Sequence, residues 1–163
     1  METCLLAAGV VTLGVSLGLA SVSDLSCRTI PNACVVSAAL AAMPLAVSAP
    51  DLSASLGRSL SGAVVVVALL TVAASLSRRI HGHDGVGAGD IKLLGALGLW
   101  AGPVGGLAVV GGSCLLALVG RAAVLRFRKS ASRTMHCRDG SMPMAPAIFA
   151  ATLLTYAMGL WAW

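Results

Sequence analysis

The chain has 163 residues, of which 58% are apolar and 10% are charged, and its formal net charge is +5. Soluble domains carry about 25% charged residues and disordered chains are poor in apolar residues, so the composition excludes both classes. The mean hydropathy is +0.94, and the charge-free runs are each near or above the roughly 18 residues that cross a bilayer. These runs cover residues 3–23, 33–50, 59–77, 93–120 and 140–163. The sequence therefore predicts an all-α, polytopic membrane protein.

We expect about six transmembrane helices within one membrane-embedded domain over residues 1–163. The expected spans are 4–22, 33–49, 58–76, 90–102, 105–125 and 143–162. The stretch 90–125 is short for two spans. However, residues 100–103, Trp-Ala-Gly-Pro, combine a turn signal with a tryptophan typical of membrane interfaces. This segment is therefore expected to separate the fourth and fifth spans.

The first span is expected to be a retained helix. Met1 and Glu2 provide no positive charge ahead of it, whereas a cleaved signal peptide carries one. Small residues, with 19 glycines in the chain, let helix backbones approach closely in lipid. Gly14 and Gly18, which are four residues apart on the first span, are one example of such small residues on one face of a helix.

The positive residues indicate the orientation. With six spans, ten of the eleven positive residues fall on one side of the membrane, and only Arg58 falls on the other. The positive-inside rule assigns the basic side to the cytoplasm. Both termini are then expected outside a multi-pass protein of the cell membrane. The basic segment 121–138 is expected to contact anionic lipid rather than nucleic acid.

No metal or cofactor is expected. The five cysteines have no zinc-site or redox spacing, and we interpret them as reduced, small apolar side chains. His81, His83 and Asp84 lie close together in a basic loop. Without a further cluster of ligands, a solvated loop is favoured over a metal site.

Two of the six acidic residues stand where an apolar span meets the cytoplasmic face. Asp24 follows the first span, and Asp90 opens the fourth. An ionisable group at this depth is costly and indicates function by default, although a single aspartate at a helix end is more often a cap. Two carboxylates that share a proton can activate a water molecule and protonate a leaving amine. The pair therefore predicts chemistry that neither residue predicts alone.

The sequence that follows Asp24 supports this interpretation. Five residues separate Asp24 from Ile30-Pro31-Asn32, where the second span begins. Pro31 suits the first turn of a helix because its missing N–H is no loss there. Asn32 has two possible roles, a bond to a neighbouring backbone group or a bond to an active-site water.

Asp90 has an equally specific context. It ends the segment Gly87-Ala88-Gly89-Asp90 and is followed by Ile-Lys-Leu. Gly87 and Gly89 permit positive φ angles and a close backbone approach, so that Asp90 can be presented at the start of a helix. Lys92 either neutralises the aspartate pair or anchors the helix at the interface.

Together these elements resemble the prepilin peptidase family, the type IV leader peptidases among the GxGD membrane aspartyl proteases. The family's first aspartate precedes Ile-Pro-Asn at this spacing, and its second lies in Gly-x-Gly-Asp followed by x-Lys-Leu. Residues 142–147, Met-Pro-Met-Ala-Pro-Ala, resemble the proline-rich start of the family's last helix. The resemblance covers the chain from about residue 20 to 155.

The resemblance implies an aspartic endopeptidase that removes the short leader of prepilin-like or pseudopilin substrates, with Asp24 and Asp90 as the catalytic pair on the cytoplasmic side. It implies a substrate with a basic leader, a glycine before the cut and an apolar helix after it. Larger members have a cysteine-bearing domain between the first two spans and also methylate the new N-terminus. Only about eight residues separate Asp24 from the second span here, so methyltransferase activity is not expected.

Three alternatives are open at this point. A preflagellin-type peptidase would carry the same motifs. A proton-coupled transporter or channel component would also use paired acids, but it predicts sequence repeats and broken helices with the acids at the midplane. An inactive scaffold would lack one aspartate, and both are present.

Overall fold

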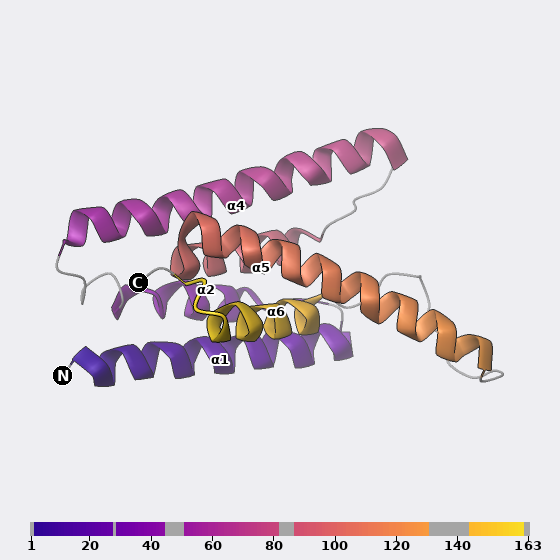
Figure 1. The fold of residues 1–163 in the computed structure, drawn as a ribbon, viewed down its shortest axis with the longest axis horizontal. Coiled ribbons are helices and arrows are strands. Elements are labelled where there is room, and N and C mark those ends of the chain that lie inside the picture. Colours follow the sequence, from indigo (N-terminus) through magenta and orange to yellow (C-terminus); the bar gives the residue numbers. More distant parts are fainter. Residues whose placement is uncertain (1, 28, 45–50, 82–86, 131–143, 162–163) are drawn as a thin grey trace.

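The computed structural model describes residues 2–27, 29–44, 51–81, 87–130 and 144–161. Every regular element in these residues is α-helical, which confirms the predicted all-α class. The helices are α1 (Glu2–Cys27), α2 (Asn32–Leu40), α4 (Leu52–His81), α5 (Ala88–Ser130) and α6 (Ala145–Ala157). Their axes lie roughly along the long axis of the molecule, and together they form a bundle (Figure 1).

Three segments of the described chain are long and apolar enough to cross a membrane: Ala7–Cys27, Leu52–Ile80 and Ala88–Ala123. By contrast, α2 has 9 residues and α6 has 13. A helix needs about 20 residues to cross the hydrocarbon core. The membrane class of the prediction therefore holds, but six full spans are not confirmed.

The predicted span 33–49 is interrupted by a turn at Ala41 and Ala42, just before Pro44, and Met43 and Pro44 are helical again. In a helix that continued to Pro44, the proline ring would clash with the carbonyl of Leu40. Accordingly α2 ends at Leu40, and the N–H of Ala42 donates to the carbonyl of Ala39 in a turn at 3.1 Å. The end of the predicted span lies outside the described residues.

The predicted span 143–162 is also shorter in the structure, because α6 ends in a glycine turn. Gly159 has a φ of +66°. Its N–H donates to the carbonyl of Tyr156 at 3.0 Å, and the N–H of Leu160 donates to that of Thr155 at 3.2 Å. This pair of bonds is the Schellman motif, which closes helices at a residue of left-handed conformation.

Helix α5 is a hairpin of two arms. Gly102, with φ 67° and ψ −172°, is not helical and is followed by Pro103. A Cβ on Gly106 would lie 3.4 Å from the Cα of Gly98, whereas a straight helix would place these residues about 12 Å apart. The arms therefore run in opposite directions, as Figure 1 shows. The predicted break at residues 100–103 is confirmed.

The first arm of α5 crosses α4 at glycines. A Cβ on Gly98 would lie 2.8 Å from the carbonyl oxygen of Gly62, and one on Gly62 would lie 2.6 Å from the carbonyl carbon of Gly102. Only residues without a side chain permit this approach. The spacing of Gly14 and Gly18 is not a packing site, since a Cβ on either would meet nothing within 4 Å.

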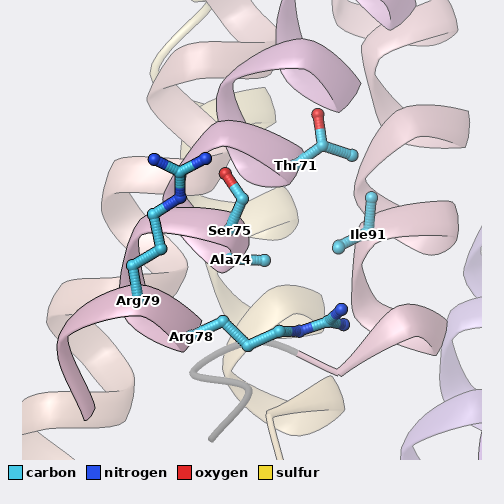
Figure 2. Close-up of a pocket in the computed structure, with 6 residues that line it drawn as sticks. All are labelled: Thr71, Ala74, Ser75, Arg78, Arg79 and Ile91. Atoms are coloured by element: carbon cyan, nitrogen blue, oxygen red, sulfur yellow. The ribbon is translucent and has the colours of Figure 1, made fainter. Parts of the chain in front are cut away.

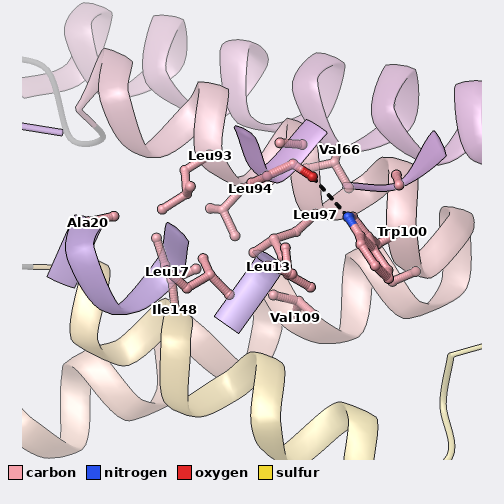
Figure 3. Packing of buried hydrophobic residues seen from close by; sticks show 14 of the residues in the cluster. Leu13, Leu17, Ala20, Val66, Leu93, Leu94, Leu97, Trp100, Val109 and Ile148 are labelled. Atoms are coloured by element: carbon pink, nitrogen blue, oxygen red, sulfur yellow. Dashed lines mark hydrogen bonds between the residues drawn. The ribbon is translucent and has the colours of Figure 1, made fainter. Parts of the chain in front are cut away.

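Trp100 lies in the core and not at an exposed interface (Figure 3). It is 3% exposed, and its Nε1–H donates to the carbonyl of Ala38 in α2 at 2.9 Å. Leu13 and Leu17 from α1 and Leu97 from α5 belong to the same apolar cluster. A buried indole N–H needs a partner, and the turn that ends α2 near this position leaves a carbonyl to provide one.

The glycine crossing leads to a stability test. We expect Gly62→Ala to lower the free energy of unfolding by about 1–3 kcal/mol, because the new methyl group overlaps backbone atoms that cannot move aside alone. Gly14→Ala is the matched control: it adds the same methyl group without overlap, so it should not lower the free energy of unfolding and should raise it by up to about 1 kcal/mol through helix propensity. Denaturant unfolding in detergent measures both. Equal effects of the two substitutions would contradict the packing described here.

Candidate active site

Asp24 lies on the buried face of α1. Leu13, Leu17, Ala20 and Asp24 recur at intervals of three and four residues and are all buried. Asp24 is the last member of this stripe, one turn before the helix ends at Cys27. The carboxylate is 9% exposed, so it is held against the bundle at the end of an otherwise apolar stripe.

The Asp24 carboxylate binds the start of α6. Its Oδ2 accepts a hydrogen bond from the backbone N–H of Ala145 at 3.0 Å. Ala145 is the first residue of α6, where backbone N–H groups lack helical partners. Pro146 follows and has no N–H to satisfy. Asp24 thus acts as an N-terminal cap supplied by another helix, and its charge is favourable at the positive end of the helix dipole.

Asp90 stands in the first turn of α5, three residues after Gly87. Its carboxylate accepts a hydrogen bond from the backbone N–H of Gly87, as the third residue of a capping box does. A Cβ on Gly87 would lie 3.0 Å from the Asp90 Oδ2, so glycine leaves room for the carboxylate. Leu94 and Leu97, one and two turns later, are buried. Asp90 therefore begins a buried stripe just as Asp24 ends one.

The two stripes bring both aspartates to one cavity of about 330 Å³. The lining residues are Asp24, Thr29, Ile30, Asn32, Gly87, Ala88, Gly89, Asp90 and Lys92. The cavity lies at the end of the bundle where α1 ends and where α2, α5 and α6 begin (Figure 1). Its volume falls within the range of ligand-binding clefts.

The loop between α1 and α2 closes one side of this cavity. The Ser23 hydroxyl donates to the carbonyl of Thr29 at 2.9 Å and holds the loop against α1. A Cβ on Gly89 would lie 3.3 Å from the Cβ of Ile30, so the start of α5 packs closely on the loop. Pro31, extended at φ −61° and ψ 131°, is the residue just before α2 rather than part of its first turn.

Lys92 and Asn32 meet across the cavity. The Lys92 ammonium group donates to the Asn32 Oδ1 at 3.5 Å, which is at the long end of the hydrogen-bond range. Both side chains are exposed. No side-chain cap bond is present at the start of α2, so Asn32 does not act as its cap. The pair spans the opening between the start of α2 and the start of α5.

Six of the seven predicted site residues line the cavity, and Pro31 does not. Sequence reasoning missed Thr29 as a lining residue and Ala145 as the partner of Asp24. The Ala145 contact is made by a backbone N–H that lies 121 positions away in the chain. No side-chain pattern reports such a donor, so only the fold reveals it.

Within the described residues, no group of three or more histidine, cysteine, aspartate or glutamate side chains could hold a metal ion. His83 and Asp84, considered above as ligands, lie outside these residues, as does the side chain of His81. Four cysteines in the described part of the chain are free thiols: Cys4, Cys27, Cys34 and Cys114.

Comparison with known families agrees with this geometry. The sequence profile of the type IV leader peptidase family matches residues 11–120, a segment that contains both Asp24 and Asp90. The chain belongs to this family, which comprises aspartic-type peptidases of the membrane. Neither a search of curated proteins nor a search of solved structures finds a match.

The cap on α6 separates two effects of changing Asp24. We expect Asp24→Ala to lower the free energy of unfolding by about 0.5–2 kcal/mol relative to Asp24→Asn, because the asparagine Oδ1 still accepts from Ala145 and alanine leaves that N–H unpaired. Denaturant unfolding of both variants in detergent measures the difference. Equal stabilities would show that the bond contributes nothing to the fold.

Proposed function

We propose that the protein is an intramembrane aspartyl endopeptidase that removes the short N-terminal leader of prepilin-like or pseudopilin substrates. The observation that supports this most strongly is that Asp24 and Asp90 line the same cavity, although 66 positions separate them. Membership of the type IV leader peptidase family supports the substrate class.

The two carboxylates provide the acid and the base for peptide hydrolysis. One carboxylate takes a proton from a water molecule as the water oxygen attacks the scissile carbonyl carbon. The other, in its protonated form, gives a proton to the carbonyl oxygen. A proton then passes to the amide nitrogen as the carbon–nitrogen bond breaks, releasing the leader and the new N-terminus. This mechanism requires that the pair holds one proton when water attacks.

The cavity suits a substrate whose cleavage site lies at the end of a membrane helix. The apolar helix of the substrate would remain in lipid beside the bundle, and its extended leader would cross the opening between Lys92 and Asn32. An unwound segment is needed there because an amide within a helix has its carbonyl shielded by the next turn.

Charge distribution supports a cytoplasmic active site. Arg78 and Arg79 lie at the end of α4, and Ile91 of α5 lines a cavity with them. Arg58 lies at the opposite end of the bundle, where a Cβ on Gly102 would be 3.3 Å from its side chain. By the positive-inside rule, the active site faces the cytoplasm of the cell membrane and both termini face outward.

We also propose a peptidase without methyltransferase activity. α1 ends at Cys27 and α2 begins at Asn32, so the link between them is too short for the cysteine-bearing domain of the bifunctional members. The single activity of leader cleavage is therefore expected from this chain.

The catalytic test uses charge removal at constant size. We expect Asp24→Asn and Asp90→Asn each to lower the cleavage rate of a prepilin-type substrate by at least about 100-fold, because each removes one proton-transfer group. Asp51→Asn is the matched control: Asp51 is exposed just before α4, outside the cavity, and its loss should leave the rate within about twofold. Cleavage is followed in liposomes by the size shift of the substrate.

Folding of each variant is checked by its unfolding curve, since asparagine retains the contact with α6 at position 24. If Asp24→Asn or Asp90→Asn cleaves at nearly the wild-type rate, that aspartate is structural and the two-carboxylate mechanism is wrong.

A further inference from the structure

A second cavity, of about 520 Å³, opens between the end of α4 and the start of α5 (Figure 2). Its lining residues are Thr71, Ala74, Ser75, Arg78, Arg79 and Ile91. None of these lines the cavity of the two aspartates. Ile91 lies between Asp90 and Lys92 in the sequence, so the two cavities adjoin opposite sides of the first turn of α5. The proposed peptidase mechanism makes no use of this second cavity.

Two arginines provide its charge. The five α4 residues of the lining recur at intervals of three and four and share one face of the helix. Arg79 extends along α4 past Ser75, and Arg78 extends across toward α5 (Figure 2). None of the described residues that line the cavity is acidic. A guanidinium group has five N–H donors in a planar fork, so it can hold a phosphate and keep a second partner.

The hydroxyl groups of Thr71 and Ser75 can act as hydrogen-bond acceptors. Thr71 donates to the carbonyl of Val67 at 2.8 Å, and Ser75 donates to that of Val72 at 2.8 Å. With these protons used inside the helix, the two oxygens retain lone pairs. The cavity therefore offers the cationic donors of Arg78 near α5 and of Arg79 beside Ser75, together with two neutral acceptors.

An apolar surface continues from the cavity along α4. Leu60, Val64 and Val67 precede Thr71 at intervals of three and four residues, so they share its face of the helix, and they are 64%, 59% and 37% exposed. They belong to the segment Leu52–Ile80, which is long and apolar enough to cross a membrane. A ligand that matches both features has an anionic head and hydrocarbon chains.

We propose that this cavity binds the phosphate headgroup of an anionic phospholipid, with the acyl chains along the apolar face of α4. Arg78 and Arg79 hold the phosphate, and the hydroxyl oxygens of Thr71 and Ser75 accept from headgroup hydroxyls such as those of glycerol. The basic leader expected of the substrate is repelled by the same arginines, which favours lipid as the occupant. Bound lipid would support the first turn of α5, which carries Asp90.

The test measures binding of fluorescent phosphatidylglycerol to the full chain in neutral detergent, with phosphatidylcholine for comparison. We expect R78Q/R79Q to weaken phosphatidylglycerol binding by about tenfold or more, because each basic residue near a phosphate contributes to membrane affinity. R121Q/R126Q is the comparison variant: both arginines are exposed on the second arm of α5, outside this cavity. They lie in the basic segment 121–138 that is expected to contact anionic lipid, so this variant measures attraction by surface charge alone and should lose less binding than R78Q/R79Q. R78K/R79K keeps the charge without the fork and should bind with intermediate affinity.

Several results would overturn the proposal. Equal losses in the two glutamine double variants would indicate attraction by net charge, and no loss in either would leave the cavity without a role. Competition by inorganic phosphate at the concentration of the lipid would indicate a free-anion site. If R78Q/R79Q binds phosphatidylglycerol normally but no longer cleaves substrate in phosphatidylcholine liposomes, the cavity is a substrate site. Lipid binding is read without peptidase activity, so its outcome is independent of the proposed function.

Discussion

The hydrogen bond from the Ala145 N–H to the Asp24 carboxylate joins α6 to α1 at the end of the bundle where the aspartates meet. Ala145 is 1% exposed, so its backbone donor is shielded from solvent and has to be satisfied within the protein. Asp24 performs this function and also lines the cavity. The position of the last helix and the geometry of the proposed active site are therefore linked through one side chain.

The reversal at Gly102 is the second constraint on the site. The first arm of α5, residues 88–101, is about 14 residues or roughly 21 Å long, which is shorter than the hydrocarbon core of a bilayer. Its side is covered by α4 at the glycine crossing and by α2 through the Trp100 bond. This short, covered arm carries Asp90 at its start, beside the cavity that it shares with Asp24.

The structure also explains why both aspartates sit at helix ends. A carboxylate in the middle of a span would require a second polar group in the core, whereas a helix start offers unpaired backbone donors. Asp24 uses the start of α6 and Asp90 uses that of α5. Each carboxylate thus accepts a hydrogen bond from a backbone N–H group while it lines the cavity.

The local motifs named residues that lie around one cavity, because the loop after Asp24 and the glycines before Asp90 are adjacent to the aspartates in the sequence. The glycines before Asp90 and the loop after Asp24 both line or adjoin the cavity as expected. The sequence also predicted the break at Gly102. Pro44 and Gly159 are residues typical of helix ends, but the predicted spans 33–49 and 143–162 ran through both.

The sequence did not predict features that depend on contacts between distant residues, such as the burial of Trp100 and the choice of packing glycines. Trp100 was interpreted as an interface residue because hydropathy does not distinguish a core indole from one in the headgroup region. Similarly, Gly14 and Gly18 have the spacing of a packing motif, but Gly62 and Gly98 make the close contact. Whether a glycine packs depends on which helix faces it, and that is a property of the fold.

The central claim, that Asp24 and Asp90 share one cavity, is tested most directly by cross-linking. Asp24→Cys and Asp90→Cys would be combined in a chain whose five native cysteines are replaced, and treated with a short bis-methanethiosulfonate reagent. Peptide mapping should identify a link within one chain for this pair and none for Asp51→Cys with Asp90→Cys. If both positions of the first pair react with a monofunctional reagent and yet no link forms between them, the two aspartates do not face one cavity and the account is wrong.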